Sequence, residues 1–419
     1  MTNVPMRGLC ALFLASIFAL PQVASAQYQL APGDIIIADH GVEFGHKTVV
    51  LRKADGTVLE PARDFVFDGG GFALSGVTDV AVDARGRILL LGYDPTGQSP
   101  LVYRVEPNGV VLPLVGARPN DAFGMATDKF GNLLIANGFV GLLRVTPDGS
   151  VQTVYSGHSS GVTIAANGDY LVSNAPQREI LRVTPQGDVS SLLQGAVLIN
   201  PLGLTRDNAD NVYIANAGRR DIVKVATDGS FRIVSRDPAL TFPTDVAIGA
   251  GGNLIVPDGG TSGSGLDAVF RIAPNGTAVP LLFDGQDGAI DGFPVDDPFG
   301  VYVVPELFIT YSGQAVRGGR ILVTIQGEPG APFLLGLSSG AQPTPLSAIF
   351  PRDDRFLDVD LSQLRGFVTG TIASNGARTL TLDIPVGTPI GRRFVQAVTL
   401  DPSTNRIDDI SNPISAEIF

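Results

Sequence analysis

The strand "GNLLIAN" at 131–137 recurs, with variation, six times along this chain, and the repeat constrains the fold more than any other feature of the sequence. Each copy is an apolar run that begins with Gly or Asp. A second strand and a turn rich in Pro, Asn, Asp and Gly follow each copy, and these turn residues favour tight hairpins. The repeat therefore predicts stacked copies of one β-unit. The six copies lie at 33–39, 86–92, 131–137, 168–174, 210–216 and 252–258.

A further apolar strand precedes five of the six copies, and its position at the two ends of the repeat indicates a closed ring. The first copy has no such strand, whereas an extra one, "DPFGVYVVP" at 297–305, follows the last copy. Pairing of the extra strand with 33–39 would complete six four-stranded units and remove free sheet edges. An open solenoid leaves the displaced strand unexplained. The sequence therefore predicts an all-β fold, with a six-bladed β-propeller over 27–305 closed by a C-terminal strand.

The first 26 residues have the features of a secretory signal peptide. Arg7 precedes an apolar segment at 8–20 that is too short to span a bilayer, and Ala24 and Ala26 form a small-residue cleavage site. The one cysteine of the chain, Cys10, lies in this segment. We therefore expect a secreted or periplasmic protein without disulfides or thiol chemistry. No later segment is long and apolar enough to predict a membrane helix.

The net charge of the chain argues against two classes of binding partner. Without Arg7, the 29 basic residues fall to 28 against 41 acidic ones, a net charge of −13. Nucleic acids and anionic membrane surfaces attract clustered positive charge, so the composition argues against both. We expect a monomer whose ligand is a small molecule, a glycan or a protein.

The repeat stops at about Glu306, and a different pattern follows. Roughly seven or eight short apolar strands, separated by Gly, Pro and Asn turns, predict a β-sandwich of immunoglobulin-like size over 306–419. This segment has no histidine and no cysteine. We expect it to support, to space or to bind rather than to catalyse.

Two segments of the repeat region carry a resemblance to a known family. "NPLGLTRDNADNVYIANAGRRDIVKVATDG" at 200–229 follows the order of the NHL repeat, and "FDGQDGAIDGFPVDDPFGVYVV" at 283–304 resembles the acidic, glycine-rich loop that leads into an NHL blade. The resemblance covers about residues 30–305. It implies a six-bladed propeller related to the gluconolactonase/regucalcin-like group, whose members include enzymes, binding platforms and scaffolds.

A third segment, "RPNDAFGMATDKFGN" at 118–132, is similar to the Arg-x-Asn-Asp segment that lines the gluconolactonase pocket. The similarity implies that Arg118, Asn120 and Asp121 face the mouth of the channel.

Gluconolactonase-like proteins hold a divalent metal ion, so Ca²⁺ or another divalent cation is the cofactor that the resemblance implies. Asp296 and Asp297, at the entrance of the closing strand, and Asp245 are the candidate metal ligands. A structural role for Asp245 stays open, because Asp79 occupies the same place in another unit.

The loops before the innermost strand and after the second strand of each unit share one rim of the predicted propeller. A binding site normally breaks the symmetry of a repeat, so loop residues that do not recur are the better candidates. The histidines either bind metal, act as a general base near neutral pH, or are merely solvated. The ligand-binding candidates on this acidic rim are His40, His46, Arg118, Asn120, Asp121, His158, Arg219 and Asp258.

An Asn or Asp ends the second strand in five of the six units, and two interpretations fit it. The side chains are either a ring of oxygen ligands for a hard cation such as Ca²⁺ or turn residues that hydrogen-bond their own loops. Recurrence in nearly every unit favours the second interpretation. The five residues are Asp39, Asn137, Asn174, Asn216 and Asp258.

Two functions of different classes fit these observations. The first is a secreted scaffold that binds a ligand or a protein through its acidic rim. The second is a metal-dependent lactonase or lyase of the gluconolactonase-like kind, in which the cation acts as a Lewis acid.

Overall fold

The computed structural model of the chain describes residues 28–40, 49–59, 75–93, 100–114, 121–259, 267–283, 295, 297–351, 353–404 and 406–419. The predicted signal peptide and four site candidates, His46, Arg118, Asn120 and Asp296, lie outside the described residues. Strands dominate, and in the described part of the chain no helix is long and apolar enough to cross a membrane.

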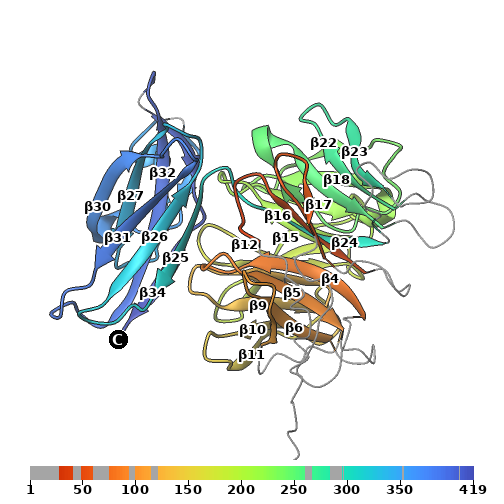
Figure 1. The fold of residues 1–419 in the computed structure, drawn as a ribbon. Helices are drawn as coiled ribbons and strands as arrows, with labels where there is room; N and C mark the ends of the chain where they lie inside the picture. The colour runs from red at the N-terminus through yellow and green to blue at the C-terminus, as the bar shows by residue number, and fades with distance from the viewer. Residues whose placement is uncertain are drawn as a thin grey trace, which may run out of the picture.

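The chain up to Val303 forms six four-stranded antiparallel sheets, as the repeat predicted (Figure 1). In chain order of their second strands, the first sheet holds β24 (Pro298–Val303), β1 (Ile35–Asp39), β2 (Val49–Arg52) and β3 (Val58–Leu59). The second holds β4 (Ser75–Val82), β5 (Ile88–Tyr93), β6 (Pro100–Val105) and β7 (Val111–Pro113). The third holds β8 (Gly124–Thr127), β9 (Leu133–Asn137), β10 (Gly141–Val145) and β11 (Val151–Tyr155).

The other three sheets repeat this order. The fourth holds β12 (Gly161–Ile164), β13 (Tyr170–Asn174), β14 (Glu179–Val183) and β15 (Val189–Gln194). The fifth holds β16 (Pro201–Arg206), β17 (Val212–Asn216), β18 (Asp221–Val225) and β19 (Phe231–Ser235), with the 3₁₀ turn η1 (Ala217–Arg219). The sixth holds β20 (Ala247–Ile248), β21 (Leu254–Asp258), β22 (Ala268–Ile272) and β23 (Ala278–Phe283), with η2 (Ala250–Gly252).

The middle strands are almost wholly apolar because both of their faces are covered by neighbouring sheets. All residues of β9, β13 and β21 are buried. One apolar cluster joins the second sheet to the third, through Leu89 and Ile135 among others. Another joins the sixth sheet to the first, through Ile255 and Ile37. This packing of repeated four-stranded sheets is that of a β-propeller.

The displaced strand pairs where the sequence predicted. β24 runs antiparallel to β1, with Ile35 opposite Val303 and Ile37 opposite Val301. The last strand of the repeat region therefore completes the first sheet, and β1 does not remain an exposed edge.

Beyond Leu307 the chain forms a separate group of sheets, here called the C-terminal unit (residues 308–418). One sheet holds β25 (Phe308–Gly313), β26 (Arg320–Gln326) and β31 (Ala377–Asp383). The other holds β30 (Leu364–Thr371), β27 (Pro332–Ser338), β32 (Gly391–Asp401), β33 (Arg406–Ile410) and β34 (Ile414–Ile418). The pair β28 (Thr344–Pro345) and β29 (Phe356–Leu357) and the turns η4 (Leu346–Ala348) and η5 (Leu361–Gln363) complete it. Val323 and Phe333, from the two larger sheets, share one apolar cluster.

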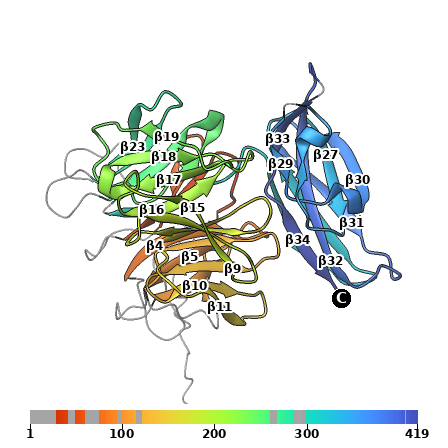
Figure 2. The same cartoon turned by 180° about the vertical axis from the view of Figure 1, so that it is seen from behind.

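The C-terminal unit packs on the propeller where the inner strands turn at their Gly corners (Figures 1 and 2). At one corner, Lys129 Nζ donates to the carbonyls of Ala341 at 2.5 Å and Asp358 at 3.0 Å. The neighbouring Phe130 meets Phe394 edge to face, with ring centroids 5.5 Å apart. The corners thus form an interface, a role that the local turn pattern did not predict.

Candidate binding channel

One position at the entrance of each inner strand defines the narrowest packing between neighbouring sheets. Four of the six residues there are glycines, and the other two are aspartates. A Cβ on Gly203 would lie 1.9 Å from Asp245 Oδ1, and a Cβ on Gly161 would lie 2.6 Å from the Leu202 carbonyl oxygen. Glycine is therefore required by close approach. In ring order the six residues are Gly300, Asp79, Gly124, Gly161, Gly203 and Asp245.

The two aspartates each bind the next inner strand of the ring. Asp79 Oδ2 accepts from the Met125 N–H at 2.5 Å, and Asp245 Oδ2 accepts from the Val301 N–H at 3.0 Å. The threonine before each aspartate does the same, since Thr78 donates to the Ala122 carbonyl and Thr244 to the Pro298 carbonyl, both at 3.2 Å. These contacts give Asp245 the structural role that the sequence left open, without excluding a second role.

Neither carboxyl group has a positively charged partner among the described residues. Burial, and then repulsion by Asp245, raises the pKa of Asp79 well above its usual value. Burial raises the pKa of Asp245 to about 7. Of the residues that the structure describes, no basic side chain forms an ion pair with either aspartate. Asp245 nevertheless keeps some exposed surface.

The pKa of Asp245 predicts how stability depends on pH. Its folded-state pKa is raised from 3.8 to about 7, so the stability it contributes at low pH is lost as pH rises through that window. We expect the melting temperature of Asp245→Asn to fall less between pH 5 and pH 8 than that of the wild type. Calorimetry at four pH values measures this, with the exposed Asp228→Asn as control. An equal loss in wild type and Asp245→Asn would refute the raised pKa.

Two phenylalanines lie at the rim end of the channel, where the inner strands begin. Phe123 and Phe299 stack with their ring centroids 6.4 Å apart. His40 packs against Phe299 and against Tyr93, each at 6.1 Å, and its Nδ1 lies 3.5 Å from Asp297 Oδ2. The structure therefore brings together two predicted site residues, His40 and Asp297, and adds three aromatic residues to them.

A second group on the rim contains His158. Its ring meets Phe139, which is 76% exposed, at a centroid distance of 4.6 Å. Burial lowers the pKa of His158, although the nearby Asp121 opposes this shift. Ser160 Oγ lies 3.4 Å from His158 Nδ1. His40 and His158 contact different residues, and His46 lies outside the described residues. The described part of the chain therefore shows no cluster of histidines.

Asp258 and Arg219 take structural positions. Asp258 is fully buried, and its carboxylate accepts from the N–H groups of Thr241 and Phe242, both at 2.8 Å. This contact agrees with the interpretation of Asp258 as a strand-ending turn residue, and its role as a ligand-binding residue stays a prediction. Arg219 donates to the Ala196 carbonyl at 3.0 Å, and its Nε lies 3.7 Å from the buried Asp221.

The strand-ending Asn and Asp residues act as loop anchors. Asn137 accepts from the Asp121 N–H at 2.9 Å, and Asn216 accepts from the Ile199 N–H at 2.7 Å. Asp258 likewise accepts from the N–H of Thr241, which lies in the loop before the inner strand of its sheet. The three hold the loop that leads into the inner strand of their own sheet. Asn174 differs, because it accepts from Gln177 in the loop that follows it, at 3.4 Å.

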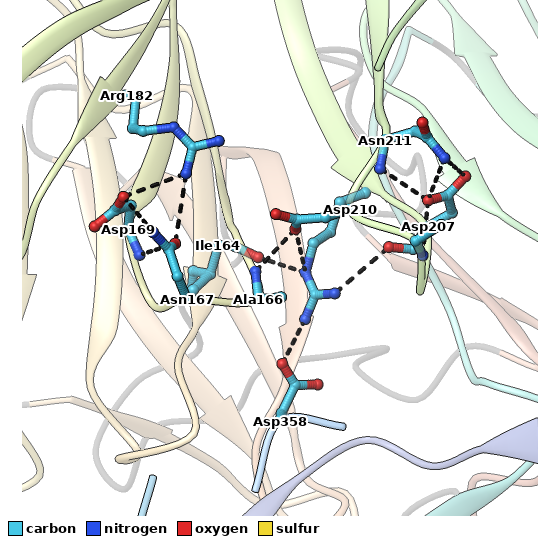
Figure 3. Close-up of polar contacts among 11 residues, drawn as sticks. Ile164, Ala166, Asn167, Asp169, Arg182, Asp207, Asp210, Asn211 and Asp358 are labelled. Carbon is cyan, nitrogen blue, oxygen red and sulfur yellow. Dashed lines mark hydrogen bonds and ion pairs between the residues drawn. The ribbon is translucent and has the colours of Figure 1, made fainter. Parts of the chain in front are cut away.

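Arg206 ends its inner strand at the end of the channel beside the C-terminal unit. Figure 3 labels its partners Ile164, Asp210 and Asp358. Its Nε donates to the Ile164 carbonyl at 2.6 Å, and its Nη2 donates to Asp358 Oδ1 at 2.8 Å. Asp210, 3.8 Å from Nε, accepts from the Ala166 N–H at 2.8 Å. One guanidinium therefore joins two sheets of the propeller to the C-terminal unit.

The recurring basic residues of the third strands are also structural. Arg182 lies 3.2 Å from Asp169, and Lys224 lies 3.1 Å from Asp207. Each pair ties the third strand to the corner before the second strand of the same sheet, as Figure 3 shows for Arg182.

A single cavity of about 1440 Å³ connects these features. Its wall includes Phe123 and Phe299 at one end, Asp79 and Asp245 beyond them, and Arg206 near the other end. Residues of the C-terminal unit contribute to the wall at that far end. The repeat pattern did not reveal the two phenylalanines, although "FG" at 123–124 and 299–300 departs from the other four units and is the signal that points to them.

The predicted metal site stays a prediction. Within the described residues, no group of three or more His, Cys, Asp or Glu side chains is placed to hold a metal ion. Asp245 lines the channel wall, whereas Asp297 pairs with His40. Asp296 lies outside the described residues.

No family model and no curated protein matches the chain. Solved structures are similar at low identity. Virginiamycin B lyase from Staphylococcus aureus is 16% identical, with 66% of this chain and 83% of that chain covered and a TM-score of 0.44. A streptogramin B lyase is 14% identical, with 70% and 96% covered and a TM-score of 0.45. The extracellular domain of a putative one-component system from B. thetaiotaomicron is 10% identical, with 92% and 55% covered and a TM-score of 0.41. Likenesses at this level do not identify an activity.

Proposed function

We propose that the protein is an extracytoplasmic ligand-binding protein whose propeller channel takes a small molecule. In this proposal residues 27–305 form a closed six-bladed NHL-type propeller, and residues 306–419 form a β-sandwich that supports one end of the channel. The apolar cluster between the sixth and first sheets and the pairing of β24 with β1 support closure. The two face-to-face sheets of the C-terminal unit support the sandwich.

The observation that carries the proposal is the cavity itself. Ligand sites are concave, largely apolar and provided with a few polar groups that orient the ligand. The cavity has this composition, because the aromatic pair Phe123 and Phe299 lies near the accessible carboxyl group of Asp245. The C-terminal unit packs at the other end, so we propose that a ligand enters at the phenylalanine end.

A thermal-shift screen of small molecules tests this function, with Phe299→Ala as the site variant. We expect a ligand that stabilises the wild type to bind Phe299→Ala at least about tenfold more weakly, because an aromatic side chain supplies a large contact area. Phe367→Ala is the matched control, since Phe367 is 62% exposed on β30 of the C-terminal unit. Equal affinity for all three proteins would place the ligand outside the channel.

A metal-dependent lactonase or lyase is the second candidate, and one observation favours it. Asp245, one of the candidate metal ligands, lines the wall of the channel. In this candidate a divalent cation such as Ca²⁺, held by Asp245, Asp296 and Asp297, would polarise the carbonyl of the substrate. Metal content of the purified protein and lactone hydrolysis with and without a chelator test it. Turnover that the chelator abolishes would favour the enzyme, and a metal-free protein without turnover would eliminate it.

A further inference from the structure

We propose, on the basis of the ligand-binding function above, that the channel binds an organic ammonium ion. Its positive charge would lie against Asp79 and Asp245, and its apolar part would lie against Phe123 and Phe299. The inference names the chemical class of the ligand and rests on the position and charge of these four side chains.

The Asp79 carboxyl group lies next to both phenylalanine-bearing strands. Its Oδ1 is 2.5 Å from the place where a Cβ on Gly300, the neighbour of Phe299, would stand. Its Oδ2 accepts from the N–H of Met125, two residues after Phe123. The Asp79 carboxyl group therefore lies between the two strands that carry the stacked rings.

The charge balance of the channel wall is incomplete. Buried carboxylates in proteins are normally paired with a cation or become protonated. Asp79 and Asp245 repel each other, and in the described part of the chain no basic side chain pairs with them. A bound cation would supply the missing charge and allow both groups to ionise.

An organic ammonium ion fits this wall better than a hard metal ion. Ca²⁺ takes six to eight oxygen ligands, whereas the described residues offer no group of three acidic or histidine side chains. Both oxygens of Asp79 already accept a backbone N–H, from Val80 at 2.7 Å and from Met125 at 2.5 Å, and Asp245 Oδ2 accepts the N–H of Val301. Aromatic faces attract ammonium groups, and the Phe123 and Phe299 rings provide them at the same end of the cavity.

Isothermal titration calorimetry with three probes of similar shape tests the inference on the wild-type protein. The probes are 2-phenylethylammonium, the neutral 2-phenylethanol and the anionic 3-phenylpropanoate. At pH 7 we expect the ammonium probe to bind at least about tenfold more tightly than the other two.

Asp245→Asn is the site variant, because its amide oxygen can still accept the Val301 N–H. We expect it to bind the ammonium probe at least about tenfold more weakly, because the negative charge that attracts the ammonium group is removed. Asp228→Asn, which changes the charge by the same amount in an exposed turn, should behave as the wild type. Circular dichroism and the melting temperature establish that both variants are folded.

Three outcomes would overturn the inference. The first is equal affinity for the neutral and charged probes, and the second is ammonium binding that Asp245→Asn leaves unchanged. The third is a channel ligand from the screen that is neutral or anionic, needs Phe299 and excludes the ammonium probe. That last result would leave the proposed function intact, whereas the absence of any ligand that depends on Phe299 would refute both.

Discussion

Gly203→Ala is expected to lower the free energy of unfolding by about 3 kcal/mol, because the new methyl group has no room. A Cβ there would lie 1.9 Å from Asp245 Oδ1, 2.6 Å from its Cγ and 2.7 Å from its Cα. The Cα belongs to the backbone of the next sheet, so rotation of the Asp245 side chain alone cannot relieve the clash. Urea unfolding followed by circular dichroism measures the effect.

Gly366→Ala is the matched control for this prediction. Gly366 lies in β30, and a Cβ there would meet no atom within 4 Å. We expect its free energy of unfolding to stay within about 1 kcal/mol of the wild type, because alanine suits a strand at least as well as glycine. A loss for Gly203→Ala no larger than that for Gly366→Ala would show that the inner strands are not packed as closely as described.

Arg206→Ala is expected to lower the free energy of unfolding by about 3 kcal/mol and to weaken the attachment of the C-terminal unit. The change removes the 2.8 Å contact to Asp358, which is only 7% exposed, and leaves that carboxylate without its partner. It also removes the donor to the Ile164 carbonyl. Limited proteolysis should cut the chain between the propeller and the C-terminal unit faster than in the wild type.

The exposed pair Arg320 and Asp383 is the control. Its two ends are also 2.8 Å apart, but their side chains are 64% and 71% exposed. Arg320→Ala should cost under ~1 kcal/mol, because water screens the pair. The double variant Arg206→Ala, Asp358→Ala should recover part of the loss. Equal costs for Arg206→Ala and Arg320→Ala would mean that Arg206 does not hold the interface.

Several elements of the fold could be predicted because their signals are local. Apolar runs of fixed length, Gly corners and hairpin turns occur within a few residues of one another, and the six four-stranded sheets follow them. The interpretation of Asn137 and Asn216 as turn residues was close, but the structure moves their partners. Each side chain accepts from the loop before the inner strand, 16 or 17 residues earlier in the chain, and Asn216 also donates to Asp221 beyond the turn that follows it.

The candidate site was harder to predict, because side chains repeated for packing can also line a cavity. Asp245 was considered as a metal ligand or a structural residue, and the structure shows it bound to the next strand while it still lines the channel. Asp258 had two interpretations in the sequence, ligand-binding residue and turn residue, and the structure shows it buried and bound to the loop at Thr241.

The sequence by itself determined the repeated strands and their turns, because hydrophobic periodicity and turn chemistry are properties of short segments. It also determined the pairing of the displaced strand with the first, because one unit lacks a strand and one extra strand follows the last unit. Only the tertiary structure decided that Phe123 stacks on Phe299, that Asp79 and Asp245 share one channel wall, and that the C-terminal unit packs on the Gly corners. These contacts join residues far apart in the chain. Their positions depend on how closely the sheets pack around the channel, and no local pattern records that distance.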